Sequence, residues 1–387
     1  MGFHVAKSSW QCFLSLNPPS ILLLLTVTTA FAQWNVAATD TTSAFRGIHN
    51  VGSGVIWASG TNGTVLRSED DGYMWQQCSV PPEAVKLDFR AVFGWNADHA
   101  VVMSIGTGAA SRLYETTDGC ASWHLLFENP DRTGFWDALT FRGNTGFILG
   151  DPVGGRFALY RSDDLGRNWH RDNNAGLAVA SDDEGVFAAS NSSLVIGPNS
   201  ELLIATGGVG GPRLLRLGES GSWSVARVPL AGGKQSAGIF SIAFRDSSHG
   251  IAVGGDYKEP AQTDGTAAWT SDGGATWHAA SALPSGYRSS VAWDRKTHAW
   301  IAVGPNGGDL SLDDGRTWKR FDSGNWNALS LPWVAGPKGQ IASLDTASPA
   351  FVRAIQRGSR KRQTNAHFSY RKQWSGNAIF PGDTETR

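Results

Sequence analysis

Short runs of apolar residues, separated by polar or glycine-rich turns, recur along most of the chain. One kind of run ends in glycine, as in residues 55–60, and similar runs end at Gly106, Gly150, Gly207, Gly254 and Gly304. These runs are too short for typical helices and are bounded by turn residues. The pattern predicts an all-β chain built from many short strands.

A second kind of run lies upstream of each of these and begins with an aromatic residue in most cases. We expect seven such segments to form the first strand of a repeated unit. They are Phe45–Ile48, Phe89–Val92, Trp136–Leu139, Phe187–Ala189, Phe240–Ala243, Ser289–Ala292 and Trp326–Leu329.

A polar motif of the form Ser/Thr-x-Asp-x-Gly-x-Thr-Trp recurs after these strands. Clear copies end at Trp277 and Trp318, looser copies end at Trp75, Trp123 and Trp169, and a worn copy without its aspartate ends at Trp223. Spacing of roughly 40–50 residues is typical of four-stranded propeller blades. The last unit lacks the motif, and we expect Trp34–Ala37 to supply its outer strand. The sequence therefore predicts one β-propeller of about seven blades, closed between its two ends, with six and eight as alternatives.

The repeated motif resembles the Asp-box, or bacterial neuraminidase repeat. Its aspartate is expected to accept hydrogen bonds from the backbone of its own turn, its glycine to adopt positive φ, and its tryptophan to cover the turn. One carboxylate per motif is too few oxygens for a calcium site, so we expect no metal and no cofactor. The residues given this structural role are Asp70, Trp75, Asp118, Trp123, Asp164, Trp169, Asp272, Trp277, Asp313 and Trp318.

The two ends of the chain differ from the repeats. Residues 1–32 combine Lys7, an apolar stretch over 21–27 and a small-residue cleavage pattern ending at Ala32, the order of a secretory signal. We expect export to the periplasm or the medium, a propeller over residues 33–356, and a basic, solvated tail over 357–387. An anchor for an anionic surface is the alternative for the tail. Cys78 and Cys120 would remain after signal removal, and the sequence leaves open whether they form a disulfide.

Composition narrows the choice of partners. The formal net charge is −1 over 387 residues, whereas nucleic-acid binding needs a clustered basic surface. No apolar run reaches the roughly 18 residues that span a bilayer. We therefore expect an unidentified protein, a subunit of a membrane complex or a glycan as partner, with no nucleic acid and no transmembrane segment in the mature chain.

Functional residues are expected on the loops at the end opposite the aspartate turns. The second positions of the first strands, Arg46, Arg90, Asp137, Ala188, Ser241, Ser290 and Asn327, would form a partly polar ring near the axis. Alternatively, the charges in this ring merely neutralise one another. The predicted partner-binding residues are Arg46, Arg90, Asp137, Asp151, Arg156, Glu184, Asp256, Tyr257, Lys258, Tyr287 and Arg288.

Several of these loops resemble one family of exported propellers. The segments Phe89-Arg90, Gly150–Val153, Ser236–Ser241, Gly254–Lys258 and Gly286–Ser289 are similar to those of the photosystem II stability/assembly factor-like proteins. The resemblance implies a seven-bladed propeller and, in photosynthetic members, a non-catalytic role in assembling a membrane complex. It also implies docking through surface arginines, here Arg46, Arg90 and Arg288. The basic tail and the worn fourth motif depart from the family pattern.

A glycan-active enzyme is the alternative function, because sialidases and other glycosidases carry the same motif. Asp88, Asp137, Asp151, Glu184 and Asp256 are the candidate carboxyl groups for a glycosidase. Arg46, Arg90 and Arg288, with Tyr287 and Glu184, are the candidates for a sialidase, although Phe45–Ile48 departs from the sialidase signature. An oxidoreductase is not expected, since Gly106-Thr107-Gly108 lacks the strand–turn–helix setting of a nucleotide site. The sequence favours binding or assembly over catalysis, and a propeller with no partner is a third possibility.

Overall fold

The computed structural model of the chain describes residues 34–172, 176–218, 220–348, 351–353 and 355–356. The predicted signal segment, residues 1–32, and the predicted tail, residues 357–387, lie outside these ranges. Within the described ranges, no helix is long and apolar enough to cross a membrane.

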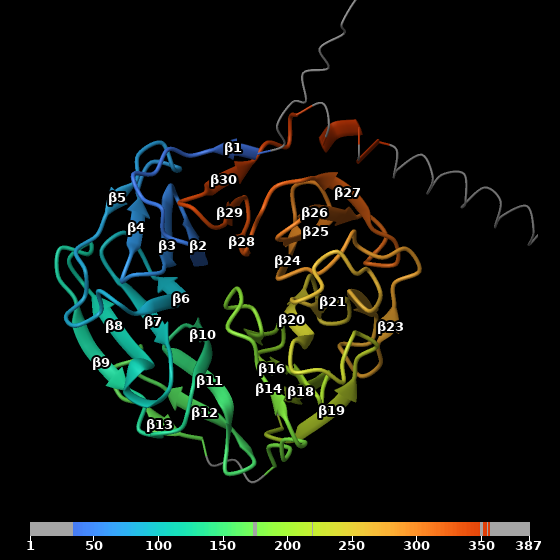
Figure 1. The fold of residues 1–387 in the computed structure, drawn as a ribbon, viewed down its shortest axis with the longest axis horizontal. Helices are drawn as coiled ribbons and strands as arrows, with labels where there is room; N and C mark the ends of the chain where they lie inside the picture. The colour runs from blue at the N-terminus through green and yellow to red at the C-terminus, as the bar shows by residue number, and fades with distance from the viewer. Residues whose placement is uncertain (1–33, 173–175, 219, 349–350, 354, 357–387) are drawn as a thin grey trace, which may run out of the picture. The chain divides into compact units, whose positions relative to one another are not determined.

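The described chain forms seven antiparallel sheets arranged as blades around a central axis (Figure 1). This confirms the predicted all-β propeller and its blade count. The first three blades contain β2 (Phe45–Gly52), β3 (Val55–Gly60), β4 (Val65–Ser68) and β5 (Gln76–Gln77); β6 (Asp88–Gly94), β7 (Ala100–Ile105), β8 (Arg112–Thr116) and β9 (His124–Glu128); and β10 (Trp136–Arg142), β11 (Thr145–Val153), β12 (Arg156–Ser162) and β13 (His170–Arg171). A short 3₁₀ turn, η1 (Gly108–Ala110), lies between β7 and β8.

The remaining blades follow the same plan with two added short strands. Blade four contains β15 (Leu194–Ile196), β16 (Leu202–Ala205), β18 (Arg213–Leu217) and β19 (Trp223–Arg227); blade five contains β20 (Ala237–Phe244), β21 (Gly250–Asp256), β22 (Ala267–Thr270) and β23 (His278–Ala279); blade six contains β24 (Ser290–Asp294), β25 (Ala299–Gly304), β26 (Gly307–Ser311) and β27 (Lys319–Asp322). Blade seven contains β28 (Ala328–Ser330), β29 (Trp333–Ala335), β30 (Ile341–Leu344) and β1 (Trp34–Val36). The added strands β14 (Glu184–Gly185) and β17 (Gly207–Gly208) extend the inner edge of blade five.

Pairing between β1 and β30 closes the ring. Trp34 lies opposite Leu344 and Val36 opposite Ala342, so the first described strand of the chain becomes the outer strand of the last blade. Trp34 is buried against Phe321 and Trp326 of the neighbouring segments. The predicted closure between the two ends is confirmed.

The first strand of blade four was predicted wrongly. Residues 187–189 form no strand, and the inner strand of this blade is β15, which begins at Leu194. Residues 184–193, here called the crossing segment, instead extend toward the middle of the ring, where Figure 1 shows a light green loop between β10 and β20. After β14, the polar groups of this segment are hydrogen-bonded to blades two, three, five and six. Because these bonds are shared among four blades, residues 186–193 do not form a strand of one sheet.

The aspartate turns have the hydrogen bonds expected from their sequence. In the turn after β22, Asp272 Oδ1 accepts bonds from Thr270 Oγ1 at 2.8 Å and from the Thr276 amide at 2.9 Å. The indole of Trp277 donates to the Gly274 carbonyl at 3.1 Å and is buried. Equivalent carboxylate contacts occur at Asp70, Asp118, Asp164 and Asp313.

Large side chains between adjacent blades form much of the core. Trp57 of blade one is fully buried among Val92 and Val102 of blade two, and its indole donates to the Asn96 carbonyl at 3.0 Å. A Cβ on Gly94 would lie 2.4 Å from the Trp57 ring, so only glycine leaves room for it. The blades are thus held together by interlocking apolar surfaces.

A disulfide joins blades one and two. Cys78 follows β5, and Cys120 lies in the aspartate turn of blade two, at a sequence separation of 42 residues. Cys120 has a φ of 66° and occupies the position taken by Gly72, Gly166, Gly274 and Gly315 in other turns. The structure therefore settles the pairing that the sequence left open.

We expect removal of this disulfide to lower the free energy of unfolding by about 3–4 kcal/mol, because a cross-link over a loop of this length restricts the unfolded chain. Two double variants separate the loss of the cross-link from the backbone strain at position 120. They are Cys78→Ala/Cys120→Ala and Cys78→Ala/Cys120→Gly, and urea unfolding measures the stability of each. The glycine variant is expected to be the more stable of the two, since glycine adopts positive φ without strain. Equal stability of both variants and the oxidised protein would contradict the prediction.

The aspartate turns predict acid sensitivity. Hydrogen bonds from Ser122 and Asn168 lower the pKa values of Asp118 and Asp164, respectively, to about 2. A carboxyl group with a lower pKa in the folded state stabilises the fold above its ordinary pKa, and this contribution disappears as the pH falls through the folded value. We expect unfolding free energy to fall between about pH 4 and about pH 2. Asp164→Asn should reduce this pH dependence, whereas Asp71→Asn, at an exposed carboxyl without a side-chain hydrogen bond, should leave it unchanged in denaturant titrations.

Candidate functional site

The inner strands place functional side chains by means of β-bulges. In β2, β6, β10 and β20 the register shifts by one residue near the start of the strand, at Arg46, Arg90, Asp137 and Phe240, respectively. A bulged residue is left out of the ladder, and the bulge re-aims its side chain. All four of these residues line one cavity near the axis.

A small residue follows six of the residues that line this cavity, each in or just before an inner strand. Gly47, Ala91, Ala138, Ser241, Ser290 and Ala328 are buried, and they follow Arg46, Arg90, Asp137, Phe240, Ser289 and Asn327, respectively. A Cβ on Gly47 would lie 3.1 Å from the Val92 amide nitrogen of the next blade. Small residues therefore allow the inner strands to approach one another, while the preceding side chains face the cavity.

The mouth cavity is the hollow lined by these residues and by the crossing segment. Its volume is about 580 Å³, within the range of small-molecule and peptide-anchor sites. It lies where the inner strands begin, and the aspartate turns follow the third strands at the opposite end of the blades. The aspartate turns therefore lie at the end of the blades opposite the mouth cavity, as predicted, and a recognition role for the loops around the cavity stays a prediction.

Two arginines lie on one side of the mouth cavity. Arg90 donates to the Ala188 carbonyl of the crossing segment at 2.9 Å, and its nearest carboxylate is Asp88 at 3.9 Å. Burial, together with the charge of Arg46, lowers the pKa of Arg90 to about 10. Arg46 is half-buried, and its side chain forms no hydrogen bond or ion pair with any residue of the described chain. The two arginines are thus half-buried, and their one ion pair within the described chain is the 3.9 Å contact of Arg90 with Asp88.

Two aspartates also line the mouth cavity. Asp137 is 2% exposed, and its Oδ2 atom has no hydrogen-bond partner within the described residues. Burial and the nearby charge of Asp151 raise the pKa of Asp137 well above its ordinary value. Asp151 accepts a hydrogen bond from the Val186 amide at 3.0 Å, and burial raises its pKa as well.

Aromatic rings form another wall of the cavity. Phe187 of the crossing segment stacks on Phe240 with 3.9 Å between ring centroids, and Tyr287 meets Phe240 edge-on at 4.7 Å. Tyr257 is 48% exposed and lies edge-on to the same pair. Burial raises the pKa of Tyr287, so its hydroxyl stays protonated near neutral pH. The cavity can therefore receive both charged and apolar groups.

Comparison with solved structures identifies the fold. YCF48 from Cyanidioschyzon merolae matches with a TM-score of 0.58 and 20% identity, over 82% of this chain and 100% of that one. YCF48 bound to a D1 peptide matches with a TM-score of 0.56 and 16% identity, over 81% and 97%. The GH74 xyloglucanase from Xanthomonas campestris matches with a TM-score of 0.52 and 16% identity, over 75% of this chain and 48% of that one. No family model and no curated protein sequence matches the chain.

The likeness is one of fold. YCF48 shares the propeller that the sequence resemblance implied, and the xyloglucanase shows that a similar propeller also occurs in an enzyme. At these identities the fold does not decide between binding and catalysis. The choice between binding and catalysis therefore depends on the side chains of this protein.

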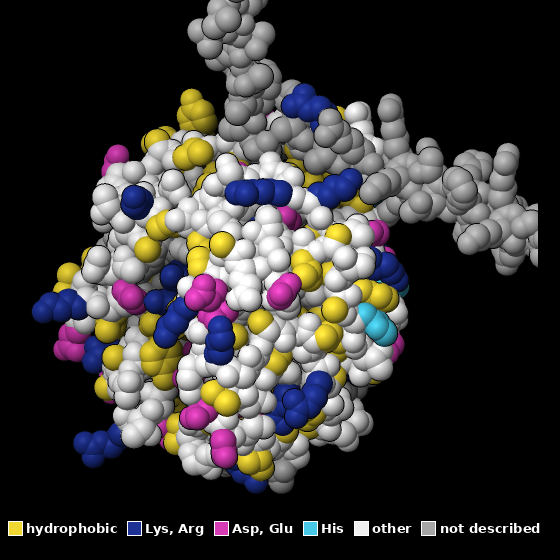
Figure 2. Space-filling view, turned by 45° about the vertical axis from the view of Figure 1, so that its right-hand side comes forward, with side chains coloured by type: hydrophobic (Ala, Val, Ile, Leu, Met, Phe, Trp, Pro, Cys, Tyr) yellow, Lys and Arg dark blue, Asp and Glu magenta, His cyan; other side chains and the backbone are white. Residues whose placement is uncertain are grey.

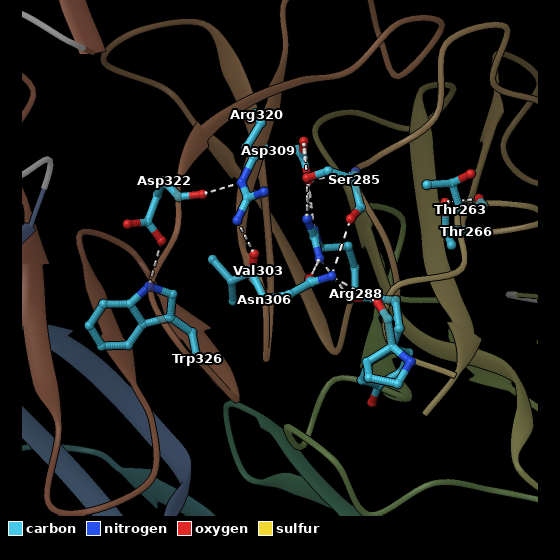
Figure 3. Close-up of polar contacts among 12 residues, drawn as sticks. Thr263, Thr266, Ser285, Arg288, Val303, Asn306, Asp309, Arg320, Asp322 and Trp326 are labelled. Atoms are coloured by element: carbon cyan, nitrogen blue, oxygen red, sulfur yellow. Dashed lines mark hydrogen bonds and ion pairs between the residues drawn. The ribbon is translucent and has the colours of Figure 1, made fainter. Parts of the chain in front are cut away.

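Arg288 was predicted to face a partner, but the structure buries it. Its guanidinium is 0% exposed and is paired with Asp309, with further contacts to Ser285 Oγ at 2.9 Å and Asn306 Oδ1 at 2.6 Å. Figure 3 shows these side chains converging on Arg288, away from Asp322 and Trp326. Arg288 therefore belongs to a structural ion pair and does not line the mouth cavity.

Two predicted acidic residues are also held elsewhere. Burial alone would raise the pKa of Glu184, but hydrogen bonds from Arg213 and Thr206 outweigh it and lower the pKa. Asp256 is buried and pairs with Lys234 at 2.9 Å. With Glu184 and Arg288 both buried in ion pairs, the sialidase arrangement of three arginines, Tyr287 and Glu184 does not assemble.

The remaining predicted residues lie near the mouth cavity but do not line it. The carboxylate of Asp88 lies 3.9 Å from the guanidinium of Arg90. The side chains of Arg156 and Lys258 are exposed. On the face seen in Figure 2, acidic, basic and apolar side chains are interspersed, without a large patch of one sign. Among the described residues, no group of three or more His, Cys, Asp and Glu side chains is placed to hold a metal ion.

Phe240, Ser289 and the cavity-lining role of Phe187 were not predicted from the sequence. Taking second positions of the expected strands gave Ser241 and Ser290, which are buried and accept bonds from the Val291 and Leu329 amides. Aligning the strands on their small residue would have selected Phe240 and Ser289. Phe187 carries no comparable signal, because the crossing segment matches no repeat.

The buried position of Arg288 predicts a stability effect. Arg288→Ala leaves the Asp309 carboxylate buried without its cation, and we expect a loss of about 3–5 kcal/mol in unfolding free energy. Arg288→Ala/Asp309→Ala should recover part of this loss, because neither charge then remains unpaired. Urea unfolding measures both, and a wild-type value for Arg288→Ala would contradict the assignment.

Proposed function

We propose that this chain is an exported, non-catalytic propeller that binds a segment of a partner protein in its mouth cavity. The observation that carries the proposal is the half-buried pair Arg46 and Arg90, whose one ion pair within the described chain is the 3.9 Å contact of Arg90 with Asp88. Arginines in such a setting bind carboxylate groups strongly. The adjoining aromatic wall would accept an apolar side chain of the same segment.

The comparison with YCF48 supports this proposal. One of the matching structures is YCF48 bound to a D1 peptide, so a propeller of this fold binds a peptide. By analogy, the partner of this chain would be a protein, such as a subunit of a membrane complex, and its role would be assembly or stability. The predicted signal over residues 1–32 would deliver the propeller to the compartment of that partner.

We expect the purified propeller to enrich binders from a phage-displayed library of random linear peptides. Synthetic copies of the enriched peptides should bind Arg46→Gln/Arg90→Gln about tenfold or more weakly, because two charge-assisted contacts are lost. Arg167→Gln changes an exposed arginine in the aspartate turn of blade three and should have no effect. Fluorescence anisotropy measures the affinities, and thermal unfolding checks that each variant is folded. Absence of enriched peptides, or equal binding to the cavity variant, would falsify the proposal.

A glycan-active enzyme is the second candidate. Asp137 and Asp151 line the same cavity, and a buried carboxyl with a raised pKa is the usual form of a general acid in glycosidases. An assay with chromogenic glycosides tests this candidate. Hydrolysis that Asp137→Asn abolishes would replace the binding proposal by catalysis.

A further inference from the structure

The four charged side chains of the mouth cavity form two pairs of like sign. The charge of Arg46 lowers the pKa of Arg90, and the charge of Asp151 raises the pKa of Asp137. Arg90 and Asp137 are near enough to interact electrostatically, but in the described chain neither arginine forms an ion pair with either aspartate. The alternative in which Arg46, Arg90 and Asp137 neutralise one another is represented here by the through-space attraction between Arg90 and Asp137, without a hydrogen-bonded ion pair. Within the described chain, the arginine pair has one ion pair, the 3.9 Å contact of Arg90 with Asp88, and the aspartate pair has none.

Asp137 provides one half of a recognition site. Its Oδ2 atom is buried and has no hydrogen-bond partner among the described residues, and the backbone amides of Asp151 and Ala188 offset the effect of burial on its pKa only in part. An unsatisfied buried polar atom is costly, and it is rarely left without a function. Asp151 lies beside it and adds negative charge. An ammonium group entering the cavity would satisfy Oδ2 and neutralise this side.

The arginines provide the other half. Arg90 is held in place by its bond to the Ala188 carbonyl, and the Arg46 side chain forms no hydrogen bond or ion pair within the described chain. Two guanidinium groups that repel each other in a partly buried site are stabilised by a shared anion. A carboxylate is the anion that matches their planar donors.

The aromatic wall defines the rest of the ligand. The stacked rings of Phe187 and Phe240, flanked by Tyr287, present apolar surface beside both charged pairs. Tyr257 stands partly exposed beside them. A ligand with a flat or bulky apolar group would cover this surface.

We infer that the mouth cavity binds a compact zwitterion, an α-amino acid with an aromatic or large apolar side chain. Its ammonium group would lie against Asp137 and Asp151, its carboxylate against Arg46 and Arg90, and its side chain against Phe240. This inference concerns the same cavity as the proposed function and specifies the chemistry it recognises. A partner segment carrying neighbouring basic, acidic and aromatic side chains offers the same chemistry from a protein.

Three matched compounds test whether both charges are required. L-Phenylalanine carries both, phenethylamine only the cation, and 3-phenylpropionate only the anion, on the same aromatic group. By isothermal titration calorimetry on the full chain, we expect phenylalanine to bind at least about tenfold more tightly than either analogue. Equal binding of 3-phenylpropionate and phenylalanine would show a plain anion site and overturn the inference.

Two variants assign the charges to their partners. Asp137→Asn should lower the affinity for phenylalanine to the level of the affinity for 3-phenylpropionate, and the affinity for 3-phenylpropionate itself should not change. Arg46→Gln should lower the affinity for phenylalanine to the level of the affinity for phenethylamine, and the affinity for phenethylamine itself should not change. Arg167→Gln, at the opposite end of the blades, is the matched control and should bind all three compounds as the wild type does. Loss of every compound from a folded variant, or of none, would contradict this assignment.

The outcomes separate this inference from the proposed function. Binding of phenylalanine without enrichment of any displayed peptide supports a free amino acid as the ligand and contradicts the protein partner. Enriched peptides that depend on Arg46 and Arg90, with no binding of phenylalanine, leave the proposed function intact and overturn the zwitterion. Enriched peptides that compete with phenylalanine place both at the same subsites.

Discussion

The pairing of β1 with β30 is the interaction on which the other features depend. Three residue pairs join the first described strand to the last one, and they convert a row of blades into a ring. An open row would leave two sheet edges exposed and would not bring blade seven against blade one. The mouth cavity needs that contact, because Arg46 comes from blade one, Asn327 from blade seven and Asp137 from blade three. The apolar contacts of Trp34 with Phe321 and Trp326 support the three-residue pairing.

Within the closed ring, the inner strands combine close packing with polar exposure. A small residue in each of six strands lets neighbouring blades approach, and in four of these strands the preceding residue is released from the ladder by a bulge. The same short sequence thus provides both the packing between blades and the lining of the mouth cavity. Substituting the small residue would push blades apart, whereas substituting the residue before it would change the cavity lining and, at Arg90, the bond to the Ala188 carbonyl.

The crossing segment forms one wall of the mouth cavity. Its backbone and side chains bond to four blades, and it supplies Phe187, Ala188 and Ala189 to the cavity wall. It also positions both charged pairs, since Ala188 accepts from Arg90 and Val186 donates to Asp151. The ion pair of Glu184 with Arg213 anchors the start of the segment. Glu184 is therefore important for the site without facing a ligand.

The sequence by itself determined the repeat, and with it most of the fold. Motif spacing, strand pattern and the missing outer strand of the last unit predicted seven blades and their closure, because these depend on local turn chemistry and alternation. It also selected Arg46, Arg90, Asp137, Asp151, Tyr257 and Tyr287, which all line the cavity. Only the tertiary structure decided that Arg288 and Glu184 are buried in ion pairs, since Asp309 and Arg213 are distant in sequence and their meeting depends on blade packing. It alone also decided that residues 184–193 cross the ring and that Phe240, rather than Ser241, faces the cavity, because a one-residue bulge changes which side chain points inward.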